Sequence, residues 1–263
     1  MQNLKTLTHN NLTKSIFDTT YKQSIMVHGK RGLSMIEVEQ LTKTYGKLKA
    51  VDHISLCAKP YEITVLLGPN GAGKSTTIKS ITNLLKYEGT IRICGHANDS
   101  IEAKRSFGYI PETPMLYDLL TVKEHIDFIS HAYNCKDNQQ ITEEYLNLFE
   151  LKEKLKTPAK ELSKGMKQKL SMLLALIIEP KALLVDEPMV GLDPYSIEAT
   201  LHLLEKLKKQ GVAILISTHI IDVINEIWDE AYIMNKGQII KHVFKSECET
   251  ETLKNLFFEV TGE

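Results

Sequence analysis

Three short apolar runs divide the chain and predict strands that are buried on both faces. They are EITVLLG at residues 62–68, ALLVDEP at 182–188 and VAILIST at 212–218. Runs of this length without a polar break are typical of parallel strands that helices cover on both sides. Two weaker strand patterns precede them, at residues 36–40 and 54–57. The pattern therefore predicts an α/β domain.

Apolar residues at helical spacing predict the elements between these strands. Ile78, Ile81 and Leu85 recur at this spacing after the first run, and SMLLALII at 171–178 predicts a buried helix. This buried helix opens on LSKGMKQKL at 162–170, where Ser, Lys and Gly are crowded at its start. Free backbone N–H groups and the positive end of the helix dipole make such a start an anion-binding site.

Residues 113–160 are also mostly helical in pattern, most clearly at 121–132 and 141–151. Thr121 and Glu124 have the spacing of a capping box, which predicts that a helix begins there. A chain of 263 residues can form one large α/β domain with a modest insertion.

The first 34 residues differ from the rest of the chain. They contain five basic residues and a single acid, Asp18, and they show no sustained apolar period. We expect a disordered extension. A basic, acid-poor leader is similar in charge to an organelle transit peptide, but arginine is nearly absent and no cleavage signal is evident. Met35, where a clean strand pattern begins, is an alternative start of the protein.

Composition and charge limit the partners and the cellular compartment that we expect for the protein. The formal net charge of -1 gives no reason to expect nucleic acid as a partner. The four cysteines, Cys57, Cys94, Cys135 and Cys248, are far apart and form no Cys-x-x-Cys pair, which favours reduced thiols in a cytosol. No apolar run approaches the roughly 18 residues that a membrane span needs, so we expect the chain not to cross a membrane by itself.

A glycine-rich loop follows the first buried strand directly. GPNGAGKST stands between that strand and a helix, in the order that the Gly-x-x-x-x-Gly-Lys-[Ser/Thr] phosphate loop requires. Glycine lets the backbone turn so that its N–H groups face phosphates, Lys74 reaches the β- and γ-phosphates, and the Ser75 hydroxyl ligates Mg²⁺. The predicted nucleotide-binding residues of this loop are Gly68, Pro69, Asn70, Gly71, Ala72, Gly73, Lys74, Ser75 and Thr76.

Two carboxylates follow the second buried strand. Asp186 comes at its carboxyl end, the edge at which open parallel sheets bind ligands, and is predicted to hold Mg²⁺ with Ser75. Glu187 is expected to point the other way along the pleat and to polarise a water molecule for attack on the γ-phosphate. Without a phosphate loop upstream, two acids here would more often form a solvated turn.

His219 follows the third buried strand, before the helical pattern IIDVINEIW at 220–228. A hydrogen bond from its ring to the γ-phosphate or to the attacking water is one role open to it. A structural or merely exposed histidine is the alternative.

Taken in order, these motifs resemble those of the ATP-binding cassette (ABC) family. The motifs are the phosphate loop, the Ser-Lys-Gly stretch, Asp186 with Glu187, GLDP at 191–194, and His219. The resemblance implies a P-loop ATPase over residues 35–263, with ATP and Mg²⁺ as cofactors. Its core sheet would be mostly parallel, its N-terminal strands would form an antiparallel layer, and about 113–168 would form a helical subdomain.

In this family two cassettes meet head to tail, and each nucleotide lies between one phosphate loop and the partner's Leu-Ser-Gly-Gly-Gln stretch. LSKGM resembles that stretch, which implies that Ser163, Lys164 and Gly165 contact the γ-phosphate held by a partner cassette. The chain departs from the pattern at Lys164, which replaces a glycine, and at Met166, which replaces a glutamine. Lysine keeps the site cationic, so the phosphate contact is not lost. An ordinary capped helix is the alternative.

Three further residues have roles implied by the resemblance. Asp193 belongs to a segment similar to the D-loop of the dimer seam, although its position before Pro194 also predicts a helix N-cap. Tyr45 occupies the place of the adenine-stacking aromatic, and a plain strand-end tyrosine is the alternative. Glu112 stands where the family usually has a glutamine that contacts Mg²⁺ and the membrane subunit. A carboxylate there would bind Mg²⁺ more strongly but repel the γ-phosphate, so that role is in doubt.

The resemblance implies an ATPase that powers transport through a separate transmembrane permease, with a second copy or a homologous cassette as its dimer partner. SKGMKQKL and the amphipathic tail LKNLFFEVTGE are similar to segments of bacterial two-component exporters, so export is the expected direction. The chain would then be cytoplasmic and peripheral on the inner face of the cell membrane.

Two other functions compete with this interpretation. A P-loop kinase for a small metabolite would need an acceptor pocket and would not need LSKGM or GLDP. A cassette that acts on chromosomes or ribosomes is the closer rival. Chromosome types insert long coiled coils, and no sustained heptads occur between the phosphate loop and LSKGM. Ribosome types generally carry two cassettes, and this chain has no internal repeat.

Overall fold

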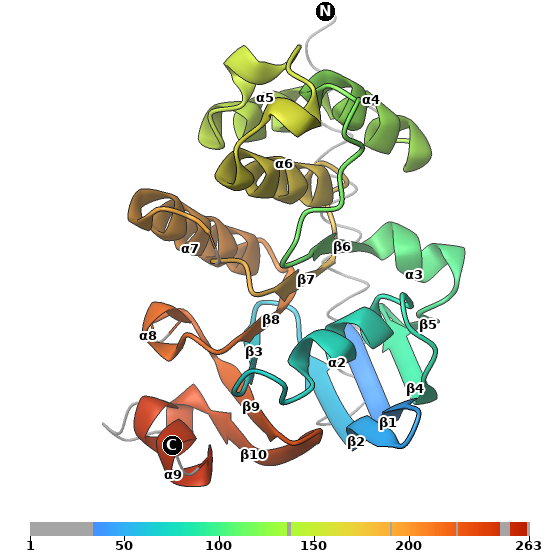
Figure 1. The fold of residues 1–263 in the computed structure, drawn as a ribbon, viewed down its shortest axis with the longest axis vertical. Helices are drawn as coiled ribbons and strands as arrows, with labels where there is room; N and C mark the ends of the chain where they lie inside the picture. The colour runs from blue at the N-terminus through green and yellow to red at the C-terminus, as the bar shows by residue number, and fades with distance from the viewer. Residues whose placement is uncertain (1–33, 136–137, 190, 225, 248–252, 262–263) are drawn as a thin grey trace, which may run out of the picture. The chain divides into compact units, whose positions relative to one another are not determined.

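The computed structural model of the protein describes residues 34–135, 138–189, 191–224, 226–247 and 253–261, and Figure 1 shows their arrangement. Apart from Ser34, the predicted N-terminal extension lies outside the described residues, and so does Cys248. Within these ranges the chain forms an antiparallel sheet and a larger, mostly parallel sheet. In this part of the chain, no helix combines the length and the apolarity that a membrane crossing requires.

The smaller sheet has four strands in the order β2-β1-β4-β5 in the described part, and neighbouring strands are antiparallel. Its two longest strands contain the predicted segments 36–40 and 54–57 but extend beyond them. Gln40 and His53 have a positive φ of 52°, and the strand register shifts around them. Such irregularities break the apolar alternation, so the sequence pattern marks only part of each strand. The strands are β1 (Ile36–Tyr45), β2 (Leu48–Ala58), β4 (Glu88–Ile93) and β5 (His96–Ala97).

The larger sheet has the strand order β10-β9-β3-β8-β7-β6 among the described residues. All neighbouring strands are parallel except β10, which pairs antiparallel with β9 at one edge. Every residue of β3, β7 and β8 is buried, as their apolar sequences predict. The expected α/β fold with a mostly parallel core sheet is thereby confirmed. The strands are β3 (Ile63–Leu67), β6 (Phe107–Ile110), β7 (Ala182–Asp186), β8 (Ala213–Thr218), β9 (Glu230–Asn235) and β10 (Gln238–Phe244).

Helices connect these strands, and Figure 1 shows α4, α5 and α6 gathered beyond the β6 edge of the larger sheet. The helices are α2 (Lys74–Ile81), α3 (Ile101–Ser106), α4 (Val122–Ala132), α5 (Gln139–Leu148), α6 (Lys164–Leu176), α7 (Pro194–Lys209), α8 (Ile221–Ile224) and α9 (Leu253–Thr261). Short 3₁₀ helices occur at Lys152–Lys154, Ala159–Glu161 and Lys245–Glu247. Most predicted helical segments therefore exist. α4 ends at Ala132 as predicted, whereas α2 and α5 end elsewhere.

The helix after the phosphate loop is shorter than its apolar spacing suggests. α2 ends at Ile81, so Leu85 lies beyond it. The Thr82 hydroxyl donates to the Ile78 carbonyl at 3.2 Å, and Asn83 takes a left-handed φ of 58°. A hydroxyl bonded to the preceding turn and an asparagine in the left-handed region are both typical of helix ends. The prediction that this helix continues to Leu85 was wrong.

The predicted capping box is confirmed. The Thr121 hydroxyl accepts a hydrogen bond from the Glu124 N–H at 3.2 Å, and the Glu124 carboxylate accepts one from the Thr121 N–H at 2.7 Å. Together these bonds start α4. α5 covers Gln139–Leu148 rather than 141–151, because Glu150 takes a left-handed φ of 58° soon after its end.

The parallel sheet has two buried faces with different partners. Along β7, Ala182 and Leu184 pack in a core shared with the antiparallel sheet and α2, whereas Leu183 and Val185 pack in a core shared with α4 to α7. This division follows from the two-residue period of a strand. Because β3, β8 and β7 are adjacent and parallel, their carboxyl ends meet at one edge of the sheet.

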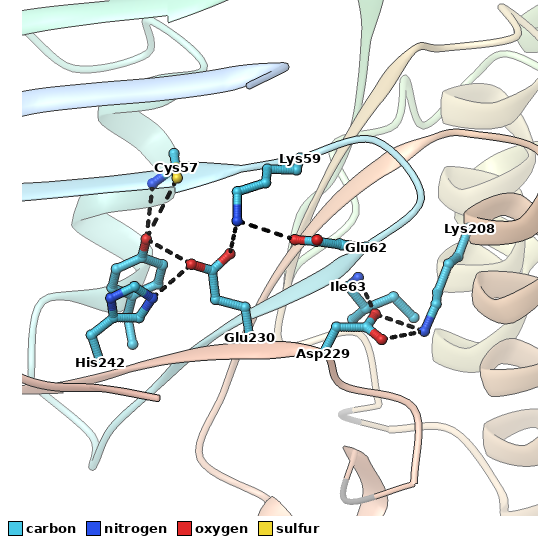
Figure 2. Close-up of polar contacts among 9 residues, drawn as sticks. Cys57, Lys59, Glu62, Ile63, Lys208, Asp229, Glu230 and His242 are labelled. Carbon is cyan, nitrogen blue, oxygen red and sulfur yellow. Dashed lines mark hydrogen bonds and ion pairs between the residues drawn. The ribbon is translucent and has the colours of Figure 1, made fainter. Parts of the chain in front are cut away.

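A cluster of polar side chains fixes the C-terminal hairpin to the antiparallel sheet, as Figure 2 shows. Glu230, at the start of β9, is only 1% exposed, and its Oε1 lies 2.6 Å from Nε2 of His242 on β10. The Tyr232 hydroxyl donates to the same oxygen at 3.2 Å and accepts from the Cys57 N–H on β2 at 3.3 Å. Burial raises the pKa of Tyr232, which keeps its hydroxyl protonated as a donor. Lys59 Nζ lies 3.8 Å from the other Glu230 oxygen.

Asp229 joins two more elements beside this cluster (Figure 2). Its Oδ2 accepts a hydrogen bond from the Ile63 N–H, at the start of β3, at 2.8 Å. The same oxygen lies 2.6 Å from Nζ of Lys208, in the last turn of α7. The end of α7 is therefore held against the strand that leads into the phosphate loop.

We expect Glu230→Gln to lower the free energy of unfolding by about 1–3 kcal/mol. The neutral amide loses a charge-assisted bond and sets an NH₂ group among the donors of His242, Tyr232 and Lys59. Urea unfolding measures the change. Glu198→Gln, at an exposed position of α7, is the matched control and should change stability by less than about 0.5 kcal/mol. Equal unfolding midpoints for the two variants would show that the cluster does not stabilise the hairpin.

Candidate nucleotide site

The predicted phosphate loop lies between β3 and α2, where its glycines have very close neighbours. A Cβ on Gly68 would stand 2.2 Å from the Met234 carbonyl oxygen, and a Cβ on Gly73 would stand 2.5 Å from the Ala50 carbonyl oxygen. Gly73 also has a φ of 108°, which disfavours any other residue. No side chain of the described residues caps the start of α2. Its free N–H groups and positive dipole end therefore suit an anion.

A cavity of about 560 Å³ opens in front of this loop. It lies at the sheet edge where the carboxyl ends of β3, β7 and β8 meet, the usual ligand position in open parallel sheets. The predicted residues that line it are Asn70, Gly71, Gly73, Lys74, Ser75, Thr76, Glu112, Glu187 and His219. The lining residues that were not predicted are Ala50, Met189, Gly191 and Ile220. Gly68, Pro69 and Ala72 belong to the loop but do not line the cavity.

Asp186 and Ser75 form the part of the site that suits a metal ion. The Ser75 hydroxyl donates to Asp186 Oδ1 at 3.0 Å, and the Ser217 hydroxyl on β8 donates to the same oxygen. Asp186 is only 1% exposed, and its Oδ2 has no hydrogen-bond partner among the described residues. A buried carboxylate oxygen in this state calls for a partner, and a cation beside a serine hydroxyl supplies one. The residues therefore fit Mg²⁺.

Glu187 lies between a lysine and a histidine. Its Oε1 is 3.3 Å from Lys74 Nζ, and its Oε2 is 3.0 Å from His219 Nδ1. Strand β7 ends at Asp186, and Glu187 takes a left-handed φ of 48° while its N–H donates to the Ser217 carbonyl at 3.0 Å. The pleat of the strand, which was the predicted reason for the direction of Glu187, does not apply, because the residue has already left the strand. Its side chain lines the cavity, as its predicted role requires.

The structure gives His219 a partner that the sequence did not suggest. The predicted partners were the γ-phosphate and the attacking water, whereas the observed contact of Nδ1 is the Glu187 carboxylate. The ring is half-exposed and lines the cavity, so it can orient Glu187 from the solvent side. Its hydrogen bond to phosphate or water stays a prediction.

The LSKGM stretch forms the start of α6, outside this cavity. The Ser163 hydroxyl accepts a hydrogen bond from the Met166 N–H at 3.2 Å and caps the helix as predicted. The Lys164 side chain lies along Gly191, where an added Cβ would stand 3.1 Å from Lys164 Cε. Ser163, Lys164 and Gly165 do not line the cavity of their own chain. Their contact with a nucleotide held by a partner stays a prediction.

Asp193 caps α7, as its position before Pro194 predicts. Its carboxylate accepts hydrogen bonds from the Ser196 N–H at 3.0 Å and from the Ser196 hydroxyl at 2.6 Å. These bonds lower the pKa of Asp193. The cap is confirmed, and the role of Asp193 at a dimer seam stays a prediction.

Tyr45 and Glu112 differ in their relation to the cavity. Tyr45 ends β1 with 47% of its surface exposed, and Lys43 Nζ lies 4.8 Å from its ring centroid, but it does not line the cavity. Its stacking on adenine stays a prediction. Glu112 is exposed at the rim and lines the cavity.

The charge of Glu112 also affects Tyr109, the last but one residue of β6. Burial raises the pKa of the Tyr109 hydroxyl, and the negative charges of Asp186 and Glu112 raise it further.

Among the residues of this site that were not predicted, two had a signal in the sequence. Gly191 lines the cavity and has a φ of 84°, and the sequence signal was its place at the head of GLDP. Ser217 bonds to Asp186 from the neighbouring strand. Its signal was weaker, a serine near the end of a buried run, where a hydroxyl needs a partner.

Comparisons with known proteins agree with this geometry. The profile of the family described as "ABC transporter" matches residues 51–190. The ABC-type transporter ATP-binding protein EcsA of Bacillus subtilis is 34% identical over 88% of this chain and 98% of that protein. The SkfA peptide export ATP-binding protein SkfE of the same organism is 32% identical over 83% of this chain and 93% of its own length.

Solved structures agree as well. A structure titled as the ATP-binding subunit of an ABC transporter has a TM-score of 0.82 and 33% identity, and the match covers 87% of this chain and all of that one. A dimeric bacterial ABC transporter cassette has a TM-score of 0.72 and 27% identity, covering 80% of this chain and 98% of the other. The phosphate loop, LSKGM, Asp186 and Glu187 all fall inside the matched segment 51–190. This chain belongs to the ABC transporter family, whose cassettes bind and hydrolyse ATP.

Proposed function

We propose that this protein is the ATP-hydrolysing subunit that powers export through a separate membrane-spanning subunit. The observation that carries the proposal is the cavity in which Lys74, Ser75 and Glu187 converge, with the buried carboxylate of Asp186 beside them. Export is the proposed direction because one relative bears the name of a peptide export protein. The protein would then work at the inner face of the cell membrane, held there by its permease.

The residues of the cavity divide the work of phosphoryl transfer. Lys74 and the N–H groups at the start of α2 bind the β- and γ-phosphates. Ser75 and Asp186 would hold Mg²⁺, which would neutralise charge on the phosphate oxygens. Glu187 accepts a proton from the attacking water, and His219 holds the carboxylate in position.

Two cassettes are proposed to share each nucleotide. The start of α6 carries the Ser163 hydroxyl, the Lys164 ammonium and backbone N–H groups, and neither Ser163 nor Lys164 lines the cavity of its own chain. A second copy, or a homologous cassette, would bring this cationic helix start to the γ-phosphate. Asp193 would lie on the seam, and Tyr45 would stack on the base. A similar cassette of solved structure is dimeric.

We infer that a permease segment docks in a second cavity, the apolar groove of about 270 Å³ beside α4 and α6. Met115, one of its lining residues, is 80% exposed, and Leu84 is also exposed there. Exposed apolar residues around a groove are typical of protein-binding surfaces. Pro111 lines this groove and Glu112 lines the nucleotide cavity, so one short loop joins the two. The helical subdomain of about 113–168 would thus couple ATP to the permease.

Met115→Glu tests the groove. We expect the variant to bind ATP normally but to copurify with at least tenfold less of the membrane-spanning subunit, because a carboxylate cannot enter an apolar contact without a large desolvation cost. Ile240→Glu, at a partly exposed apolar position of β10, is the matched control and should copurify normally. Equal recovery with both variants would remove the groove from the interface.

Copurification also separates the competing functions. A hydrophobic multispan protein that accompanies the wild-type chain supports the transporter. Ribosomal RNA or chromosomal DNA in its place would instead favour a cassette without a transport role. A small-molecule kinase would yield a second phosphorylated product together with ADP, which phosphate analysis would detect.

A further inference from the structure

The phosphate-loop lysine and the proposed base occupy each other in this structure. Lys74 Nζ donates to the carbonyl oxygens of Gly68 at 2.7 Å and Pro69 at 3.2 Å, and it lies 3.3 Å from Glu187 Oε1. The side chains of Lys74 and Glu187 are 5% and 7% exposed. The ion pair is therefore largely shielded from water. Charge interactions are stronger in such a buried, low-dielectric place than they are in water.

This arrangement uses the full donor capacity of the ammonium and places one partner at each oxygen of the carboxylate. An ammonium has three N–H donors, and Lys74 has three acceptors on its own chain within reach. Glu187 has Lys74 at one oxygen and His219 at the other. Lys74 must therefore give up a partner before it can bind a phosphate. The ammonium also occupies part of Glu187 Oε1, and that part becomes available to water only when the ammonium leaves.

We propose that Lys74 is a latch on Glu187, and that phosphate releases it. When the β- and γ-phosphates enter the cavity, their oxygens replace the carboxylate as partners of the ammonium. The same exchange that binds the nucleotide thus frees the base, so the carboxylate becomes available only in a loaded site. The inference rests on the proposed function, in which Lys74 binds phosphate and Glu187 is the base.

The surroundings keep Glu187 in place after the exchange. Its N–H donates to the Ser217 carbonyl, its φ is 48°, and His219 contacts Oε2, and none of these features involves Lys74. The carboxylate therefore loses one partner without leaving the cavity. Glu112 lines the same cavity but makes no ion pair with Lys74 in the described part of the chain. It supplies the control for a purely repulsive effect of a carboxylate on phosphate.

A double-mutant cycle on ADP affinity tests the latch. Isothermal titration with ADP is made on the wild type, Glu187→Gln, Lys74→Met and the double variant. We expect Glu187→Gln to bind ADP about tenfold more tightly than the wild type, because Lys74 no longer has a charged competitor. In the Lys74→Met background the same change should leave the affinity unaltered. Glu112→Gln should change the ADP affinity by the same factor in the wild-type and Lys74→Met backgrounds.

Two outcomes would overturn the proposal. An equal gain from Glu187→Gln in both backgrounds would mean that the carboxylate only repels phosphate. No gain in either background would mean that Lys74 is already free to bind. ADP needs neither a second cassette nor a permease, so a wild type that fails to bind ADP would contradict the nucleotide site itself.

Unfolding of the four proteins without nucleotide is the second measurement, and it decides the case where Lys74→Met binds ADP too weakly to titrate. The ion pair predicts that the two substitutions are not additive. The double variant should melt several degrees above the temperature expected from the sum of the single changes. Additive melting temperatures would show that the two side chains do not interact, and would overturn the latch.

Discussion

Glu187→Gln is expected to slow ATP hydrolysis by roughly 100-fold or more while ATP still binds, because a general base contributes about 10²–10⁴ to a rate. The amide keeps the shape of the side chain and its contact with His219, but it cannot accept a proton from water. Because ATP would close the dimer and hydrolysis would open it, the variant should accumulate as an ATP-bound dimer. Phosphate release measures the rate, and size-exclusion chromatography with Mg²⁺ and ATP measures the dimer.

Glu112→Gln is the matched control for this substitution. Both residues line the same cavity, but Glu187 lies 3.0 Å from His219 and 3.3 Å from Lys74, whereas Glu112 is exposed at the rim. We expect Glu112→Gln to hydrolyse ATP within a few-fold of the wild-type rate. A normal rate of ATP hydrolysis by Glu187→Gln would show that Glu187 is not the base. An equal loss of rate in both variants would show that any lost carboxylate charge in the cavity slows hydrolysis, whatever its position.

The strands of the core were predictable because burial on both faces leaves a plain signal. The runs that became β3, β7 and β8 have no exposed residue, so their sequences carry no polar alternation. β1 and β2 were only partly predicted, since positive φ angles at Gln40 and His53 shift the register within them. Apolar periodicity marks where a strand is regular and fails where it is interrupted.

Helix starts were predicted better than helix ends. Thr121, Ser163 and Asp193 all cap helices as their sequences suggest, because a capping side chain and its partner lie within three residues of each other. The ends depend on left-handed residues such as Asn83 and Glu150, which are not glycine and give little local signal.

The candidate site was predictable as a set of residues, and its internal contacts were not. Lys74, Ser75, Glu187 and His219 were named from motifs, and the parallel topology brings them to one cavity. The ion pair of Lys74 with Glu187 joins side chains 113 positions apart on two different strand-loop units, and it depends on the left-handed turn at Glu187. Neither a spacing rule nor a propensity reveals such a contact.

The central claim is that one chain completes the nucleotide site of another. Lys74→Ala should abolish hydrolysis because the ammonium that binds the β- and γ-phosphates is removed. Ser163→Arg should abolish it because a bulky side chain blocks the start of α6. Each variant alone is expected to lose roughly 100-fold or more in rate, in line with the loss of one transition-state contact. Ser163→Ala is the control for the helix cap, whose loss costs only about 1 kcal/mol of stability.

Mixing the two inactive variants tests the claim most directly. A mixed dimer pairs the intact phosphate loop of the Ser163→Arg chain with the intact α6 start of the Lys74→Ala chain, which makes one complete site. The account predicts that ATPase activity returns on mixing, to no more than one working site per dimer. If the mixture stays as inactive as its parts, or reaches the full wild-type rate, the two motifs do not meet across the subunits.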